Sequence, residues 1–240
     1  MFQFTSSVLR LATLIELSGA SLKRHSETKP TMNLTETSLV MDKNRIAQLL
    51  QDWCTWRDAG DWDALRTCYT TDATMVTSWY EGSAAGFIDA SVQGRNKQPK
   101  DHGAHHIFGG TTAKVNGDRA TAETRITLIV RGMLHGKLVD VTLYGRFFDC
   151  LLKSDGKWQI NDRKGIYDRD SLRAVDPSDP INLDAQELAK YPYGYRHLAY
   201  LQAKEGAHIN MSIPQPYSEA EQAIYAHGKA WVNGVDASEA

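Results

Sequence analysis

The first strong pattern in the chain is a run of apolar residues at helical spacing between residues 42 and 60. The apolar positions recur at steps of three and four and are Ile46, Leu49, Leu50, Trp53, Cys54 and Trp56. Because Gly60 follows as a stop signal, the pattern predicts an amphipathic helix that begins at Asp42 and has Asp58 at its end. The next stretch, Asp61–Tyr69, starts with acidic residues and predicts a second, short helix packed across the first.

Beyond residue 72 the pattern changes to β-branched and alternating stretches. Ala73–Tyr80 is β-branched and aromatic, which predicts a strand. Ser83–Val92 predicts a third helix, and Gln93–Gly103 predicts a polar loop. Four longer strands are predicted at Ile107–Val115, Arg119–Arg131, Lys137–Lys153 and Lys157–Asp168. Turn signals at residues 116–118, 133–136 and 154–156 join these strands as hairpins.

Helices followed by long antiparallel strands with tight turns favour an α+β fold. We expect residues 41–172 to form a cone-shaped, curved sheet, antiparallel or mixed, wrapped around the N-terminal helices. A proline-containing linker at 176–180 then leads to a helical C-terminal extension, residues 173–240. Its predicted helices are Ala185–Lys190, Tyr195–Lys204 and Ser218–Val232. Because the extension is rich in tyrosine, we expect it to pack on the domain, cover the mouth of a pocket or join a neighbouring subunit.

Composition narrows the classes of partner. The chain has 27 basic and 29 acidic residues and a formal net charge of −2, so no overall field attracts nucleic acid or an anionic membrane. Its apolar runs are far shorter than the roughly 20 residues that cross a bilayer. The three cysteines, Cys54, Cys68 and Cys150, lack metal-type spacing and fit a reducing compartment. We expect a cytoplasmic protein with a small hydrophobic substrate, assembled as a homo-oligomer (dimer or trimer).

Residues 1–40 differ from the rest in being rich in serine and threonine and more basic than acidic. One interpretation is an organelle transit peptide, which is typically rich in arginine and serine and poor in acid. The other is a disordered tail, or an upstream start with Met32 or Met41 as the effective beginning, because this stretch shows no sustained apolar periodicity. We favour the disordered tail.

The candidate chemistry lies where three histidines, His102, His105 and His106, precede a predicted strand. A buried carboxylate that accepts a hydrogen bond from one imidazole nitrogen fixes the tautomer and leaves the opposite nitrogen free to take a proton. We predict that Asp58 makes this bond to His106 and that both face one cavity. A metal site that also uses Asp101 is the alternative, since imidazole and carboxylate bind zinc and iron. Adjacent strand residues point to opposite faces, so His105 and His106 can hardly bind one ion. We therefore expect no metal here, and we also expect no cofactor.

Several motifs resemble those of a known family. In Arg57–Arg66 an aspartate ends a helix and an acidic-Trp helix start follows, and His106–Thr111 reads His-Ile-Phe-Gly-Gly-Thr. The spacing of the predicted hairpins also matches that of the family, in the segments Asn116–Ala120, Tyr144–Asp149 and Asp155–Trp158. Over residues 43–167 the chain thereby resembles the nuclear transport factor 2-like superfamily, in particular its SnoaL-like branch, scytalone dehydratase and hexachlorocyclohexane dehydrochlorinase.

The resemblance implies that Asp58 orients His106, which acts as the general base of an elimination. The chain also departs from the dehydratase pattern. The dehydratase's two water-holding tyrosines, second histidine, serine and asparagine fall here on Arg57, Thr77, Val130, Gly145 and Phe147. The implied pocket is more apolar than the dehydratase's, so we do not expect scytalone to be the substrate.

These points lead to one main functional hypothesis and its alternatives. We expect a cofactor-independent lyase (dehydratase-type elimination) or isomerase that acts on a small apolar or polyketide-like substrate. The alternatives are a polyketide cyclase of the SnoaL type, a non-catalytic hydrophobic-ligand-binding or dimerisation protein, and the small subunit of a larger oxygenase. The expected substrate-contacting residues are Trp53, Arg57, Thr77, Trp79, Tyr80, Phe108, Val130 and Phe147. For Trp53 and Phe108, plain core packing is the competing interpretation.

Overall fold

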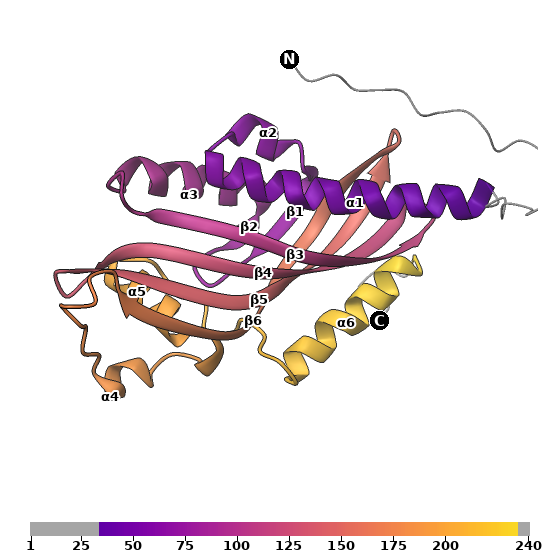
Figure 1. Cartoon of the computed structure of the whole chain (residues 1–240). Helices are drawn as coiled ribbons and strands as arrows, with labels where there is room; N and C mark the ends of the chain where they lie inside the picture. Colours follow the sequence, from indigo (N-terminus) through magenta and orange to yellow (C-terminus); the bar gives the residue numbers. More distant parts are fainter. Residues whose placement is uncertain (1–33, 235–240) are drawn as a thin grey trace, which may run out of the picture. The chain divides into compact units, whose positions relative to one another are not determined.

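The computed structural model describes residues 34–234, in which helices pack on a single sheet (Figure 1). The helices are α1 (Leu34–Ala59), α2 (Trp62–Arg66), α3 (Ala84–Lys97), α4 (Ala185–Leu188), the 3-10 helix η1 (Tyr193–Tyr195), α5 (Arg196–Lys204) and α6 (Glu219–Val232). The strands are β1 (Tyr69–Val76), β2 (Glu81–Ser83), β3 (Gly103–Asn116), β4 (Arg119–Leu134), β5 (Lys137–Ser154) and β6 (Lys157–Ala174). The predicted α+β class is confirmed.

The six strands form one curved sheet that does not close on itself, in the order β2-β1-β6-β5-β4-β3. β1 pairs with β6 in parallel, and the other neighbours pair antiparallel, so the sheet is mixed. The turns between the long strands place His135-Gly136 and Asp155-Gly156 at positive φ, from 51° to 76°. A left-handed pair of this kind is what a two-residue hairpin turn requires.

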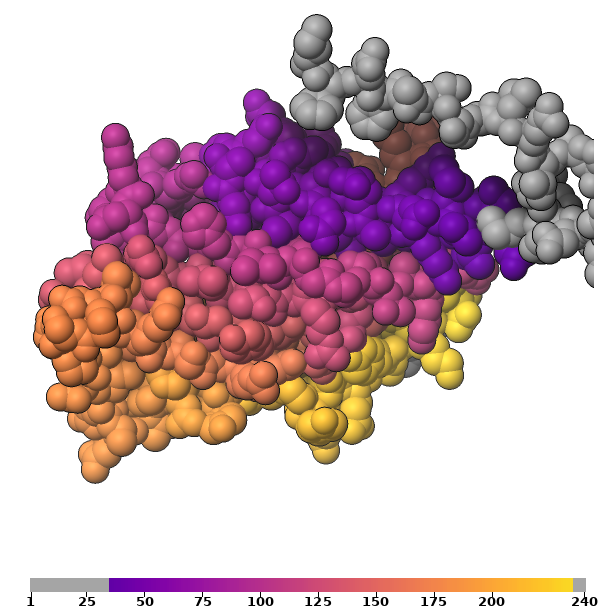
Figure 2. Space-filling view, in the orientation of Figure 1, coloured from indigo at the N-terminus to yellow at the C-terminus, as the bar shows by residue number. Residues whose placement is uncertain are grey.

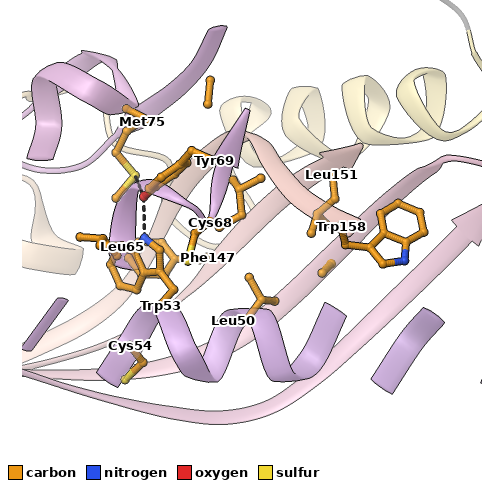
Figure 3. Packing of buried hydrophobic residues seen from close by; sticks show 14 of the residues in the cluster. Leu50, Trp53, Cys54, Leu65, Cys68, Tyr69, Met75, Phe147, Leu151 and Trp158 are labelled. Atoms are coloured by element: carbon orange, nitrogen blue, oxygen red, sulfur yellow. Dashed lines mark hydrogen bonds between the residues drawn. The ribbon is translucent and has the colours of Figure 1, made fainter. Parts of the chain in front are cut away.

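One face of the sheet, here called the α1 face, carries most of the buried side chains. Every even-numbered residue of β4 from Ala120 to Leu134 is buried, as strict alternation along a strand requires. At one end this face packs against α1, α2 and α3. Figure 3 shows Trp53 and Phe147 within this cluster. At the other end the C-terminal extension covers it, with Leu198 and Leu201 of α5 fully buried. Of the three placements expected for the extension, the structure shows packing on its own domain.

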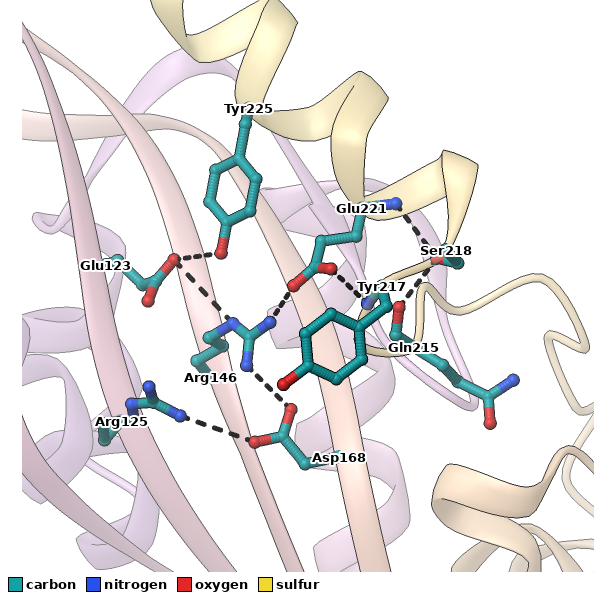
Figure 4. A network of polar contacts seen from close by, with 9 residues as sticks. All are labelled: Glu123, Arg125, Arg146, Asp168, Gln215, Tyr217, Ser218, Glu221 and Tyr225. Atoms are coloured by element: carbon teal, nitrogen blue, oxygen red, sulfur yellow. Dashed lines mark hydrogen bonds and ion pairs between the residues drawn. The ribbon is translucent and has the colours of Figure 1, made fainter.

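The opposite side of the sheet, here called the α6 face, is covered in part by α6. The contact combines an apolar cluster around Ile224 and Phe148 with a polar network. In that network the buried guanidinium of Arg146 meets Asp168, Glu221 and Glu123 (Figure 4). Glu221 lies in the first turn of α6. Ser218 caps the N-terminus of this helix, because its hydroxyl oxygen accepts a hydrogen bond from the Glu221 backbone N–H. In Figure 2 the orange and yellow C-terminal residues form a continuous surface with the strands.

The predicted elements exist, but several of their boundaries differ. α1 begins at Leu34 rather than Asp42, because its first two turns are exposed and therefore leave no apolar periodicity in the sequence. The first strand covers Tyr69–Val76 instead of Ala73–Tyr80, and the third helix runs on to Lys97. β3 to β6 extend beyond their predicted ends. The first 33 residues, on which the tail and transit-peptide hypotheses depend, lie outside the described residues.

Within residues 34–234, no helix is both long and apolar enough to span a bilayer.

The packing of α5 generates a prediction about stability. Leu198→Ala removes a fully buried side chain from the second apolar cluster, and we expect it to lower the free energy of unfolding by about 2–5 kcal/mol. The control is Met133→Ala at a position that is 45% exposed, which should stay within about 0.5 kcal/mol of the parent. Urea denaturation measures both. Equal stability of the two variants would show that α5 does not belong to the cooperative unit.

Candidate active site

The predicted contact between Asp58 and His106 is present. Asp58 lies in the last turn of α1, and His106 lies on β3, which runs alongside that helix. The His106 ring nitrogen Nδ1 is 2.7 Å from Asp58 Oδ1, and the backbone N–H of His106 donates to Asp58 Oδ2 at 2.6 Å. Because both carboxylate oxygens are bound to the same residue, backbone and side chain together fix the orientation of the imidazole.

The protonation states follow from this geometry. Burial by itself raises the pKa of Asp58, but the hydrogen bonds and charge of His106, with Arg57, outweigh it and hold the pKa below its usual value. Burial is the largest cause acting on the pKa of His106, and together with the positive charges of Arg57 and Arg163 it outweighs Asp58 and lowers that pKa. Near neutral pH the imidazole is therefore neutral. Its Nδ1–H donates to the ionised Asp58, so the lone pair of Nε2 is free to accept a proton.

Aromatic rings line the interior beside His106. The edge of the imidazole meets Trp53 with 5.6 Å between ring centroids, and Phe108 stacks on Trp53 at 5.7 Å. Phe147 contacts both of these rings edge-on, at 5.7 and 5.9 Å. Trp53 is fully buried and its Nε1–H donates to the Tyr69 hydroxyl at 2.6 Å (Figure 3). Trp53 and Phe108 thus belong to the packed core and also form an apolar wall beside His106.

A buried ion pair lies against this aromatic wall. Arg163 on β6 makes two hydrogen bonds to Asp149 on β5, of 2.6 and 2.9 Å, and both side chains are fully buried. The guanidinium carbon lies 4.4 Å from the Trp53 ring centroid and 4.7 Å from that of Phe147. Burial opposes the charge on Arg163, but Asp149 outweighs it and raises the pKa, so the guanidinium stays charged. Its Nη1 has no hydrogen-bonding partner among the described residues.

A β-bulge in β6 accounts for the inward position of Arg163. Strict alternation from Trp158 and Ile160, both on the α1 face, places Arg163 on the other face. The pairing of β5 with β6 shifts between Cys150 and Leu151, so that Asn161 is an extra residue. The bulge reverses the alternation and turns Arg163 inward. No local sequence signal marks this shift.

Arg57 and the residues after β1 flank the same end of α1. The Arg57 guanidinium lies over the rings of Trp62 and Phe87, at 5.5 and 5.7 Å, and burial lowers its pKa although Asp58 opposes the change. Thr77 is buried and its backbone N–H donates to the Tyr80 carbonyl at 2.7 Å. These contacts place Arg57 beside the dyad and give Thr77 a role in shaping the turn.

A surface cleft of about 560 Å³ opens where the turn after β1 meets the C-terminal extension. It is lined by Trp79, Tyr80, Glu81 and residues 208–212. The backbone N–H of Asn210 donates to the Ser78 carbonyl at 2.8 Å, which ties the extension to this turn. The extension therefore lies at a cleft, in line with the expectation that it covers the mouth of a pocket, although the segments that meet here are more than 120 residues apart.

The remaining predicted residues lie either where the apolar cluster around α1 meets the cluster under the C-terminal extension, or outside both clusters. Val130 lies on the α1 face but packs in the cluster that the C-terminal extension covers. His106 pairs across the strands with Leu128 of that same cluster. The His105 side chain is exposed, on the face opposite His106, as predicted from their adjacency. His102 contacts Asp101 at 3.1 Å, away from the dyad.

The chain is similar to several known proteins. A family model described as a SnoaL-like domain matches residues 39–164, more than half of the chain. Pea pathogenicity protein 2 from Fusarium vanettenii is 28% identical over 211 residues, which cover 82% of this chain and 88% of that protein. A candidate scytalone dehydratase from Novosphingobium aromaticivorans aligns with a TM-score of 0.46 at 20% identity, covering 60% of this chain and 89% of that one. A type 2 hexachlorocyclohexane dehydrochlorinase aligns with a TM-score of 0.46 at 11% identity, covering 62% and 96%.

The electrostatics of the dyad generate a prediction for nuclear magnetic resonance. A pH titration should show the His106 imidazole neutral down to below the ordinary histidine value of about 6.5, with its proton on Nδ1. Because the charge of Asp58 raises the pKa of His106, Asp58→Asn should lower it further. His105→Gln, on the exposed face, is the control and should leave the His106 titration unchanged. A higher pKa in Asp58→Asn would contradict the assigned pairing.

Proposed function

The chain belongs to the SnoaL-like domain family, and we propose that it is a cofactor-independent lyase of the dehydratase type, or an isomerase, acting on a small apolar or polyketide-like substrate. The observation that carries the proposal is the double hydrogen bond between Asp58 and His106. It leaves a neutral imidazole whose Nε2 is free, which is what a general base requires. The aromatic wall of Trp53, Phe108 and Phe147 supports an apolar substrate.

In the proposed reaction, Nε2 of His106 removes a proton from a carbon next to a carbonyl group or a leaving group. The imidazolium that forms is stabilised by the ionised Asp58. Negative charge then develops on the substrate oxygen, and the unpartnered Nη1 of Arg163 is the donor we assign to it. Arg163 suits this role because Asp149 holds it rigidly in a buried site, so no reorganisation is needed as the charge develops.

Elimination, isomerisation and cyclisation share the removal of a proton and differ in the next step. In an elimination a leaving group departs with its electron pair; in an isomerisation the proton returns at another carbon. A cyclase of the SnoaL type uses the resulting carbanion as a nucleophile. All three need the same base, and the dyad supports them equally.

A non-catalytic role in binding a hydrophobic ligand is the second candidate. The observation that favours it is the dense contact among the aromatic rings beside His106, of which Trp53 is fully buried. Such a wall holds an apolar ligand whether or not a proton is moved. The two candidates differ in whether His106 is needed for turnover or only for the shape of the interior.

The general-base role predicts a specific loss of activity. A comparison of metabolites from wild-type and Asp58→Ala cells identifies the compound that accumulates, which then serves as the assay substrate. His106→Ala should lower kcat/KM by about 10²–10⁴-fold, whereas His105→Ala should leave it unchanged. In the wild type, activity should fall on the acidic side as His106 becomes protonated. Retained ligand binding with no turnover in the wild type would favour the binding protein.

The role assigned to Arg163 requires a test that separates chemistry from folding. Replacing the whole ion pair, as in Arg163→Met with Asp149→Leu, leaves no unpaired buried charge, and such replacements are often neutral for stability. The double variant should fold as the parent does by circular dichroism and urea denaturation, yet lose about 10²–10³-fold in kcat. Added guanidinium should restore part of the loss. A folded double variant with full kcat would remove Arg163 from the mechanism.

A further inference from the structure

Three side chains with metal-binding atoms converge on the α6 face of the sheet. Cys150 lies on β5, Asp162 is its cross-strand partner on β6, and His227 comes from α6. The Cys150 sulfur, a carboxylate oxygen of Asp162 and a ring nitrogen of His227 all lie within 4.8 Å of one another. Cys150 is buried and the other two are half-buried. Ligands of one tetrahedral zinc ion lie about 3.3–3.8 Å apart, so side-chain rotations that move each atom by about 1 Å bring the three to that spacing.

The surrounding structure holds these ligands in place. The bulge at Asn161 sets Asp162 opposite Cys150 on the α6 face, by the same reversal that turns Arg163 inward. The Thr74 hydroxyl donates to Oδ1 of Asp162, while Oδ2 faces His227 Nε2 at 3.9 Å. A hydrogen bond to one oxygen of a carboxylate, such as the bond from Thr74, orients the other oxygen for metal binding. The site is thus supported from β1 as well as from its own elements.

Gly228 determines how closely α6 approaches this point. A Cβ atom at Gly228 would lie 2.4 Å from the ring of Phe148, which is too close, so only glycine lets the helix lie this near the sheet. The neighbouring residue, His227, is thereby brought within reach of Asp162.

We propose that Cys150, Asp162 and His227 bind Zn²⁺, with water as the fourth ligand, and that the ion fastens α6 to the sheet. Thiolate, imidazole and carboxylate form a donor set suited to Zn²⁺ rather than to magnesium or calcium, which select oxygen ligands. The trio comes from three separate segments, so it has none of the spacing by which metal sites are found in a sequence. It lies across the sheet from the dyad and does not depend on the proposed reaction.

Lys164 places a positive charge beside the trio, with its Nζ 3.2 Å from Oδ2 of Asp162. About a third of its side chain is exposed, so it can turn into solvent when a cation enters. Burial, with the charges of Asp162 and Asp149, raises the pKa of Cys150 to about 12. Bound Zn²⁺ deprotonates a thiol that coordinates it.

Calorimetry tests the binding directly. Zinc chloride titrated into the chelator-treated full-length chain should bind in a one-to-one ratio. His227→Gln and Cys150→Ala should each weaken binding at least tenfold, and the controls His105→Gln and Cys68→Ala should not. With Co²⁺ as the probe, the thiolate-to-cobalt absorption should appear in the wild type and in Cys68→Ala and be lost in Cys150→Ala. Absence of saturable binding to the wild type, or unchanged affinity in both ligand variants, would overturn the proposal.

Thermal unfolding tests whether the ion fastens the helix. At a zinc concentration about 100 times Kd, the melting temperature of the wild type should rise by about 5–10 °C. At the same zinc concentration, the melting temperature of His227→Gln should rise by at most about half as much, because its binding is at least tenfold weaker. Because His227 is only half-buried, we expect this variant to fold. Circular dichroism checks that it does. Binding without any rise in melting temperature would leave a zinc site but contradict its role in holding α6.

Discussion

The buried ion pair between Arg163 and Asp149 constrains the interior more than any other contact. Taking two charges out of water costs several kcal/mol for each ion, and only good geometry offsets that cost. Here the pair is doubly hydrogen-bonded, and the rings of Trp53 and Phe147 cover the guanidinium on two sides. Trp53 is held in turn by Tyr69. Helix α1 therefore cannot shift along the sheet without uncovering this charge, because it carries Trp53. The same helix carries Asp58 to its bond with His106.

The C-terminal extension completes the domain by using both faces of the same strands. Its first part places α5 on the α1 face, where Asp170 accepts hydrogen bonds from His197 Nδ1 and from the backbone N–H of Leu198. Its second part places α6 on the other face, where Glu221 meets Arg146. Helix α5 thus buries the part of the α1 face that α1 does not reach. The candidate site lies on the α1 face, where the part covered by α1 meets the part covered by α5.

The parts of the fold that sequence reasoning predicted are those with local signals. Gly60 ends the helix just after Asp58, and the alternation after His106 identifies its strand and its inward face. The bulges in β6 have no such signal, since they depend on how β5 and β6 pair over their whole length. Because of the bulge at Asn161, Arg163 faces inward and Asp162 outward, the reverse of the plain alternation. The SnoaL-like match confirms the family that the motifs indicated, while these two residues required the structure.

The lowered pKa of His106 cannot by itself account for catalysis. A histidine with an ordinary pKa of about 6.5 is already about three-quarters neutral at pH 7, so a lower value increases the amount of free base by at most about one third. The value of burial lies in the charges around the reaction. In the proposed mechanism the order is Asp58 (negative), His106 (becoming positive), substrate (becoming negative), Arg163 (positive) and Asp149 (negative). Each developing charge is flanked by a fixed opposite one, and proton transfer leaves the net charge of the buried site unchanged. In a low-dielectric interior this alternation stabilises the charge-separated state far more than water could.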